Sequence, residues 1–258
     1  MPIDPADPRL DGFRRLNEPR FRSRYETERG VFIAEGPTVV DRIVSHAGVL
    51  IGSLLVDSRA MSRVPTNVDA PVSVVSSDLI AEIVGFDFHR GMLALCRRPA
   101  SSSVAHLATL DSLAVLEGVN DHVNLGSIIR AAAGLGVGGL LMDPTTADPW
   151  YRRSVRVSMG TVVDLPMGRS ADWPAHLEAV QMAGMTLVAA TPSPSAQDIG
   201  AVGQVTRPAI MLGAEGPGLS PQALAAADLQ VRIPMSREVD SLNVGQAAAL
   251  LFHHLARS

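Results

Sequence analysis

The chain has 258 residues, of which 47% are hydrophobic, and a net charge of −4. At about 150 residues per domain, this length predicts two domains with packed cores. No apolar run approaches the roughly 20 residues that cross a bilayer, and the acidic, proline-rich start is unlike a secretory signal. The single cysteine, Cys96, supplies neither a disulfide nor a thiolate metal site. We therefore expect a soluble cytoplasmic protein with no membrane or metal partner.

All 22 basic residues are arginine, and seven of them lie among four acidic residues in the segment 9–29. Phe13, Phe21 and Tyr25 are interleaved with them. Arginine binds phosphate through two parallel hydrogen bonds and stacks on bases, so this segment suits RNA. A solvated helix with ion pairs four residues apart explains the same composition. Both interpretations stay open at this point.

The first hundred residues predict a small alternating α/β domain. In chain order we expect a strand, a turn and an amphipathic helix in "FIAEGPTVVDRIVSHAG", a strand in "LIGSLLVD", a strand and a helix from about Ser77 in "VSVVSSDLIAEIVG", and a strand in "GMLALCRR". The run "PASSSVAHL" is typical of a linker. We place the boundary so that the domains are residues 1–104 and 105–258.

The second domain alternates more regularly. We expect a strand in "LAVLEGV", a loop in "NDHVN", a helix in "LGSIIRAAAGLG", a strand in "GGLLMD", a helix in "HLEAVQMAGM" and a strand in "TLVAAT". A strand and loop in "PAIMLGAEG", a helix in "PQALAAAD", a strand in "LQVRIPM" and a helix from Asn243 follow. Strands that read as continuous apolar runs are buried on both faces, so this domain predicts a parallel sheet covered by helices.

The glycines of "GLGVGG" (134–139) match the GxGxxG pattern of dinucleotide-binding proteins. That pattern requires a strand before the glycines and a helix after them. Here a helix precedes them and a strand follows, so a helix C-cap and a tight return to the sheet explain them better.

Three polar segments interrupt the apolar second domain. In "NLGSIIRAA", Asn124 is suited to cap a helix that Gly126 and Ser127 begin. Arg130 would then lie on the first turns, where its charge opposes the helix dipole and calls for an anionic partner such as a phosphate.

The other two polar segments follow predicted strands. In "LGAEGPGLS", Glu215 lies among three glycines, and such a loop is either structural or part of the crevice where open α/β sheets bind ligands. In "SLNVGQAAALL", Asn243 and Gln246 form a serviceable cap pair, so the stretch either only caps the last helix or also carries chemistry through Ser241 and Asn243.

Taken in this order, "NLGSIIRAA", "LGAEGPGLS" and "IPM…SLNV" resemble the three signature motifs of SPOUT-superfamily RNA ribose 2′-O-methyltransferases of the SpoU branch. "DPWYRRSVRVSMG" is similar to the family segment between the first two motifs. The first domain, with "FIAEGPTVV" and "HRGMLAL", is similar to the small ribosomal-protein-like RNA-binding domain that is often joined to this catalytic domain.

The resemblance implies a deep trefoil knot, bound S-adenosylmethionine, and a homodimer in which each active site is completed across the interface. General topology rules treat knots as exceptions. Carried over by motif, the cofactor pocket would include Gly213, Ile233, Leu242, Thr191, Gly218 and Met235, and the catalytic group would be Asn124, Arg130, Glu215, Ser241 and Asn243.

Methyl transfer needs a ribose hydroxyl aligned with the sulfonium carbon, so positioning supplies much of the catalysis. A guanidinium, with a pKa above about 12, is a poor base. We therefore expect Arg130 to clamp the target phosphate and stabilise developing oxyanion charge, with a proton-accepting role left open. Asn124 and Glu215 would orient Arg130. Ser241 and Asn243 would hold the ribose or shape the knot, and Asn243 would also cap its helix.

Two positions depart from the family pattern. Arg237 stands where glycine is usual, and Gly245 stands where serine or alanine is usual. Arg237 leaves the conformation of its loop open and could add an RNA contact.

We expect an S-adenosylmethionine-dependent RNA ribose methyltransferase that acts on ribosomal RNA, because the additional first domain could grip a structured RNA. Transfer RNA is the alternative substrate. A non-catalytic RNA-binding ribosome-assembly factor that kept the fold is the alternative class, and the order around "GLGVGG" disfavours a nicotinamide oxidoreductase. The candidate RNA contacts are Arg20, Arg22, Arg24, Arg152 and Arg153.

Overall fold

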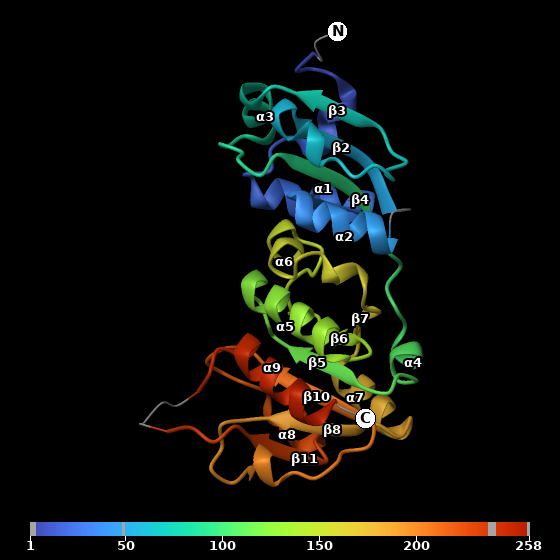
Figure 1. Cartoon of the computed structure of the whole chain (residues 1–258). Coiled ribbons are helices and arrows are strands. Elements are labelled where there is room, and N and C mark those ends of the chain that lie inside the picture. The colour runs from blue at the N-terminus through green and yellow to red at the C-terminus, as the bar shows by residue number, and fades with distance from the viewer. Residues whose placement is uncertain (1–3, 48–49, 237–240, 257–258) are drawn as a thin grey trace. The chain divides into compact units, whose positions relative to one another are not determined.

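The computed structural model describes residues 4–47, 50–236 and 241–256, and it divides into two units (Figure 1). The first unit comprises residues 1–99 together with 150–163, and the second comprises 100–149 together with 164–258. The segment 150–163 therefore groups with the first unit. The predicted division into residues 1–104 and 105–258 had placed this segment in the second domain. Arg237 lies outside the described residues. Within the described part of the chain, no helix has the length and hydrophobicity needed to cross a bilayer.

The first unit is built on a four-stranded mixed sheet with the order β1-β4-β2-β3. Strand β4 runs antiparallel to β1 and β2, and β3 pairs with β2 in parallel. The elements are 3-10 helices at Pro8–Phe13, Ser58–Arg63 and Thr161–Val163, α1 (Pro19–Arg29), β1 (Val31–Glu35), α2 (Pro37–Ala47), β2 (Ile51–Asp57), β3 (Val72–Val75), α3 (Ser77–Val84), β4 (Met92–Arg97) and α6 (Arg152–Val157).

Helix α1 docks on this unit through a buried ion pair. Arg22 and Glu26, one turn apart, are each 2% exposed, and their side chains lie 2.8 Å apart. Arg22 also donates hydrogen bonds to the backbone carbonyls of Gly12 and Arg14. Buried charges of this kind persist because they are paired and hydrogen-bonded. The arginine-rich pattern of 9–29 thus includes structural arginines.

The second unit contains a seven-stranded sheet in which every pairing is parallel, with the order β7-β6-β5-β10-β8-β11-β9. This confirms the predicted parallel sheet. The elements are α4 (Val104–Leu107), β5 (Leu113–Glu117), α5 (His122–Leu135), β6 (Leu140–Met142), β7 (Met167–Arg169), α7 (Trp173–Met182), β8 (Thr186–Ala190), β9 (Gln197–Asp198), a 3-10 helix at Ile199–Ala201, β10 (Pro208–Gly213), α8 (Pro221–Ala226), β11 (Leu229–Arg232) and α9 (Val244–Leu255).

Helices cover both faces of this sheet. Alternate strand residues such as Leu113, Val115 and Met211 form one apolar core with α4, α7 and α8. On the other side, α9 packs on β10 and also lies along α5 (Figure 1). Because both faces are buried, the central strands β5 and β10 are apolar almost throughout. The trefoil knot stays a prediction.

Two features of α5 differ from the sequence prediction. The helix begins at His122, because the Asp121 carboxylate accepts hydrogen bonds from the backbone N–H groups of Val123 and Asn124. Asn124 therefore lies inside the helix, and its predicted role as N-cap is wrong. Arg130 is consequently near the middle of α5, where the unfavourable effect of the dipole on a cation is small. At the other end, Gly136 is the left-handed C-cap, as the glycine pattern predicted.

Candidate active site

A cavity of about 480 Å³ opens where the loops after β8, β10 and β11 meet. These strands are neighbours in the sheet and run in parallel, so their carboxyl ends lie along the same edge. This edge is where open α/β sheets bind ligands. The volume falls within the roughly 300–1,000 Å³ typical of small-molecule sites.

Most of the predicted site residues line this one cavity. All six predicted cofactor residues do so: Thr191, Gly213, Gly218, Ile233, Met235 and Leu242. Of the predicted catalytic group, Glu215, Ser241 and Asn243 line it as well. Sequence reasoning predicted Ile233, Met235 and Leu242 of the apolar wall and missed its other members, which are Ala190, Pro192, Leu212, Ala214, Val231, Val244, Ala247 and Leu251. These residues read as ordinary strand and helix core, so nothing in the sequence set them apart.

Gly213 lets the loop after β10 fold back on the end of its own strand. A Cβ atom at this position would lie 2.2–2.5 Å from backbone atoms of Gly218 and Leu219. The N–H of Gly218 donates to the carbonyl of Ala214 and closes the return. Any residue other than glycine would push the loop, and Glu215 with it, away from the strand end.

The Asn243 side chain joins the three signature segments. Its Oδ1 accepts a hydrogen bond from the N–H of Gly245 and so caps α9. Its Nδ2 donates to Asn124 Oδ1 at 2.8 Å and to Glu215 Oε1 at 2.7 Å. The predicted helix cap is therefore confirmed, and the same side chain contacts Asn124 and Glu215, while its catalytic role stays a prediction.

Arg130 is not part of this cluster within one chain. It is exposed on α5 and does not line the cavity. Among the residues that the structure describes, no hydrogen bond or ion pair engages its guanidinium. Asn124 and Glu215 instead accept hydrogen bonds from Asn243. The structure thus brings together Asn124, Glu215 and Asn243, and leaves Arg130 outside.

Glu117 is a further residue at this edge that sequence reasoning missed. It ends β5, beside Gly213 in the sheet register. Its carboxylate accepts hydrogen bonds from Trp173 Nε1 at 2.8 Å and from the backbone N–H and Oγ of Ser220 at 2.8 and 2.7 Å. Ser220 caps α8 at the end of the Glu215 loop, so Glu117 fixes where this loop ends. A carboxylate at the carboxyl end of an apolar strand was the available signal.

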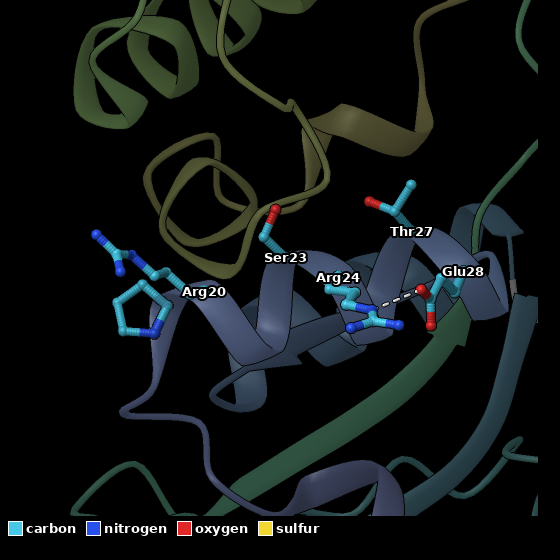
Figure 2. A pocket seen from close by; sticks show the side chains of 6 residues that line it. Arg20, Ser23, Arg24, Thr27 and Glu28 are labelled. Atoms are coloured by element: carbon cyan, nitrogen blue, oxygen red, sulfur yellow. Dashed lines mark hydrogen bonds and ion pairs between the residues drawn. The ribbon is translucent and has the colours of Figure 1, made fainter.

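The predicted RNA contacts differ in their accessibility. Arg22 cannot meet RNA, because it is buried against Glu26; this prediction is wrong. Arg20 and Arg153 are exposed. Arg24 is also exposed but pairs with Glu28 one turn further along α1. Figure 2 shows this pair at a surface hollow of the helix, with Ser23 between Arg24 and Arg20. The ion-pair interpretation of 9–29 therefore holds for Arg22 and Arg24. Arg152 is 23% exposed and bound to Glu35.

Comparisons with known proteins agree on the second unit. The model of the SpoU rRNA Methylase family matches residues 111–253, a range that contains every residue lining the cavity. An uncharacterized tRNA/rRNA methyltransferase of Mycobacterium bovis is 45% identical over 262 residues, which cover 99% of this chain and 91% of the relative. The 23S rRNA (guanosine(2553)-2'-O)-methyltransferase of Bacillus subtilis is 25% identical over 89% of this chain and 90% of its own length. The SpoU methyltransferase AviRb of Streptomyces viridochromogenes shares the fold, with a TM-score of 0.78 at 24% identity over 96% of this chain and 97% of that one.

Proposed function

The chain belongs to the SpoU rRNA Methylase family, and we propose that it transfers a methyl group from S-adenosylmethionine to a ribose 2′-hydroxyl of RNA. The observation that carries the proposal is the Asn243 side chain, which lines the cavity and donates hydrogen bonds to both Asn124 and Glu215. The ribose as acceptor, rather than a base, draws further support from the Bacillus subtilis relative.

The cavity suits the proposed cofactor. Leu212, Ile233, Leu242 and Leu251 offer apolar walls for a nucleoside, and the glycine loop at 213–218 offers backbone groups at close range. S-adenosylmethionine supplies an electrophilic methyl group on a sulfonium when it is bound. The residues that line the cavity would orient this group toward the acceptor hydroxyl.

The proposed catalytic roles follow from the charge of each side chain and from its position relative to the cavity. Ser241 and Asn243, which line the cavity, would hold the ribose, while Glu215 accepts a hydrogen bond from the Asn243 amide. Arg130 would clamp the phosphate beside the target ribose and stabilise the developing oxyanion. We propose that it does so in the site of a second copy of the chain, in a homodimer. The exposure of Arg130 on α5 supports this proposal. The neighbouring helix α9 also carries an exposed apolar side chain, Leu250, which is 49% exposed and would be covered in such a dimer.

Ribosomal RNA is the proposed substrate, and transfer RNA is the alternative. The Bacillus subtilis relative, which aligns over both units, acts on 23S rRNA. We propose that residues 1–104 form an RNA-binding domain and that Arg20 and Arg153 contact the RNA through their exposed guanidiniums.

The test is transfer of labelled methyl from S-adenosylmethionine to ribosomal and transfer RNA, followed by alkaline hydrolysis. A 2′-O-methyl group protects its own linkage from alkali, whereas a methylated base does not. Arg130→Ala should lose transfer and keep cofactor binding in calorimetry. Arg9→Gln, which removes another exposed guanidinium, is the matched control. Full activity of Arg130→Ala would refute its role, and absence of cofactor binding to the unaltered protein would favour the non-catalytic RNA-binding factor.

A further inference from the structure

Three arginines of the first unit converge on one buried carboxylate. Glu35, the last residue of β1, has a side chain that is 3% exposed. Its Oε1 lies 3.0 Å from Arg90 Nε and 3.4 Å from Arg156 Nη1, and its Oε2 lies 2.9 Å from Arg152 Nη1. We call these four residues the Glu35 cluster. Only Arg152 among them was a predicted RNA contact.

The cluster is held in place by the packing around it. Helix α6, which carries Arg152 and Arg156, packs against β1, and the Arg152 guanidinium lies over the Phe86 ring at 4.8 Å from its centroid. The glutamate thus fixes the direction of all three guanidiniums. Ordering arginines before a ligand arrives reduces the entropy that binding would otherwise cost.

The charges of the cluster do not balance. In the described part of the chain, Glu35 is the carboxylate that forms ion pairs with these three arginines, which leaves two positive charges in excess. Exposed ion pairs elsewhere in the unit match one arginine to one acid, as in Arg9–Asp7 and Arg24–Glu28. One arginine would suffice to neutralise a buried glutamate, so burial of Glu35 does not explain three.

The excess charge is accessible to a ligand. The Arg90 side chain is 55% exposed and that of Arg156 is 35% exposed. A guanidinium has five N–H donors, and the contact with Glu35 leaves most of them for another acceptor. Arg153, also exposed, adds a further positive charge on the same helix.

We propose that Arg90, Arg152 and Arg156 bind phosphate groups of the RNA backbone, with Glu35 as the anchor that positions them. The proposal rests on the proposed function in taking RNA as the polyanion. Neighbouring guanidiniums repel one another, and a phosphate relieves this repulsion while accepting charge-assisted hydrogen bonds. Such contacts position the RNA and carry no sequence information.

The experiment measures binding of a fluorescein-labelled single-stranded RNA to the full chain by anisotropy, at salt concentrations between about 50 and 200 mM. Arg90→Gln and Arg156→Gln should each weaken binding and lower the slope of log K against log salt by about 0.7, the value per phosphate contact on a single strand. Arg90→Lys should keep the slope, because the charge is retained. Arg9→Gln is the matched control and should change neither quantity, since it breaks a one-to-one ion pair.

The proposal would be overturned if Arg90→Gln and Arg156→Gln bind RNA with the same affinity and the same salt slope as the unaltered chain. If Arg156→Gln melts early in circular dichroism, Arg90→Gln decides alone, since this side chain is more than half exposed. Cofactor affinity of the same variants, measured by calorimetry, should be unchanged. Absence of cofactor binding or methyl transfer in the unaltered chain would refute the proposed function, while the RNA slopes would still decide the role of the Glu35 cluster.

Discussion

Gly245 of α9 lies close to Ser127 of the neighbouring helix α5, and we predict that a single methyl group at Gly245 will separate the two helices. A Cβ atom at residue 245 would lie 2.9 Å from the Cβ of Ser127 and 3.2 Å from Asn243 Oδ1. Carbon atoms in contact are normally about 3.5–4.0 Å apart. The Ser127 Cβ is attached directly to the backbone of α5, so it cannot rotate away and the helices themselves must move.

The expected loss of stability is small enough to measure in a folded protein. Overpacking costs about 1–3 kcal/mol, and replacing glycine by alanine returns about 0.4–1 kcal/mol through the unfolded chain. Gly245→Ala should therefore lower the free energy of unfolding by about 1–2 kcal/mol. Ser127→Gly removes the opposing Cβ atom at a helix-propensity cost of about 0.5 kcal/mol.

Urea unfolding of the unaltered chain, both single variants and the double variant completes a double-mutant cycle. Because the Asn243 Oδ1 accepts from the N–H of Gly245, the displaced helix should also weaken cofactor binding, and the added Ser127→Gly change should restore it. The steric argument would be refuted if Gly245→Ala is as stable as the unaltered chain. It would also be refuted if the changes in the free energy of unfolding of the two single variants simply add in the double variant.

Three further predictions concern polar groups. Asn243→Asp keeps a capping oxygen but sets a second carboxylate beside Glu215, so thermal stability should change little while methyl transfer, assayed with labelled cofactor, falls at least about tenfold. Arg22→Met leaves a buried carboxylate without its main partner and should cost about 3–5 kcal/mol in urea unfolding, and Glu26→Leu added to it should recover part of this loss. Glu117→Gln replaces one carboxylate oxygen by an NH₂ group, so at least one of the donors on Trp173 and Ser220 loses its acceptor and cofactor affinity in calorimetry should fall; unchanged affinity would contradict its positioning role.

The fold of the second unit could be predicted because the sequence separates its strands and helices clearly. Continuous apolar strands such as Leu113–Glu117, bounded by polar or glycine-containing loops, admit few arrangements other than a parallel sheet. The cavity at the strand ends followed from the same rule together with the three motifs. Apart from Ile233, Met235 and Leu242, its apolar wall did not, because Leu212 and Leu251 have the same pattern as any core residue.

The errors arose where two residues could make the same local interaction or where a partner is distant in sequence. Asp121 and Asn124 are both good helix caps, and only the folded backbone shows that Asp121 is used. The burial of Arg22 depends on the Glu26 pair and on backbone carbonyls, which helical periodicity does not reveal. Likewise, no local pattern tells that Arg152 meets Glu35 across more than a hundred residues.

The Asn243 amide shows why capping and catalysis were hard to separate from the sequence. The N–H of Gly245 requires an acceptor, which fixes the oxygen of the amide toward α9. The nitrogen must then face Asn124 and Glu215, and both of its hydrogens are used by their oxygens. The helix cap therefore sets the orientation of the polar group. Asn124 and Glu215 belong to this group, whereas Arg130 lies outside it within one chain. Under the proposed function, its guanidinium would reach the phosphate of the RNA in the site of a second subunit.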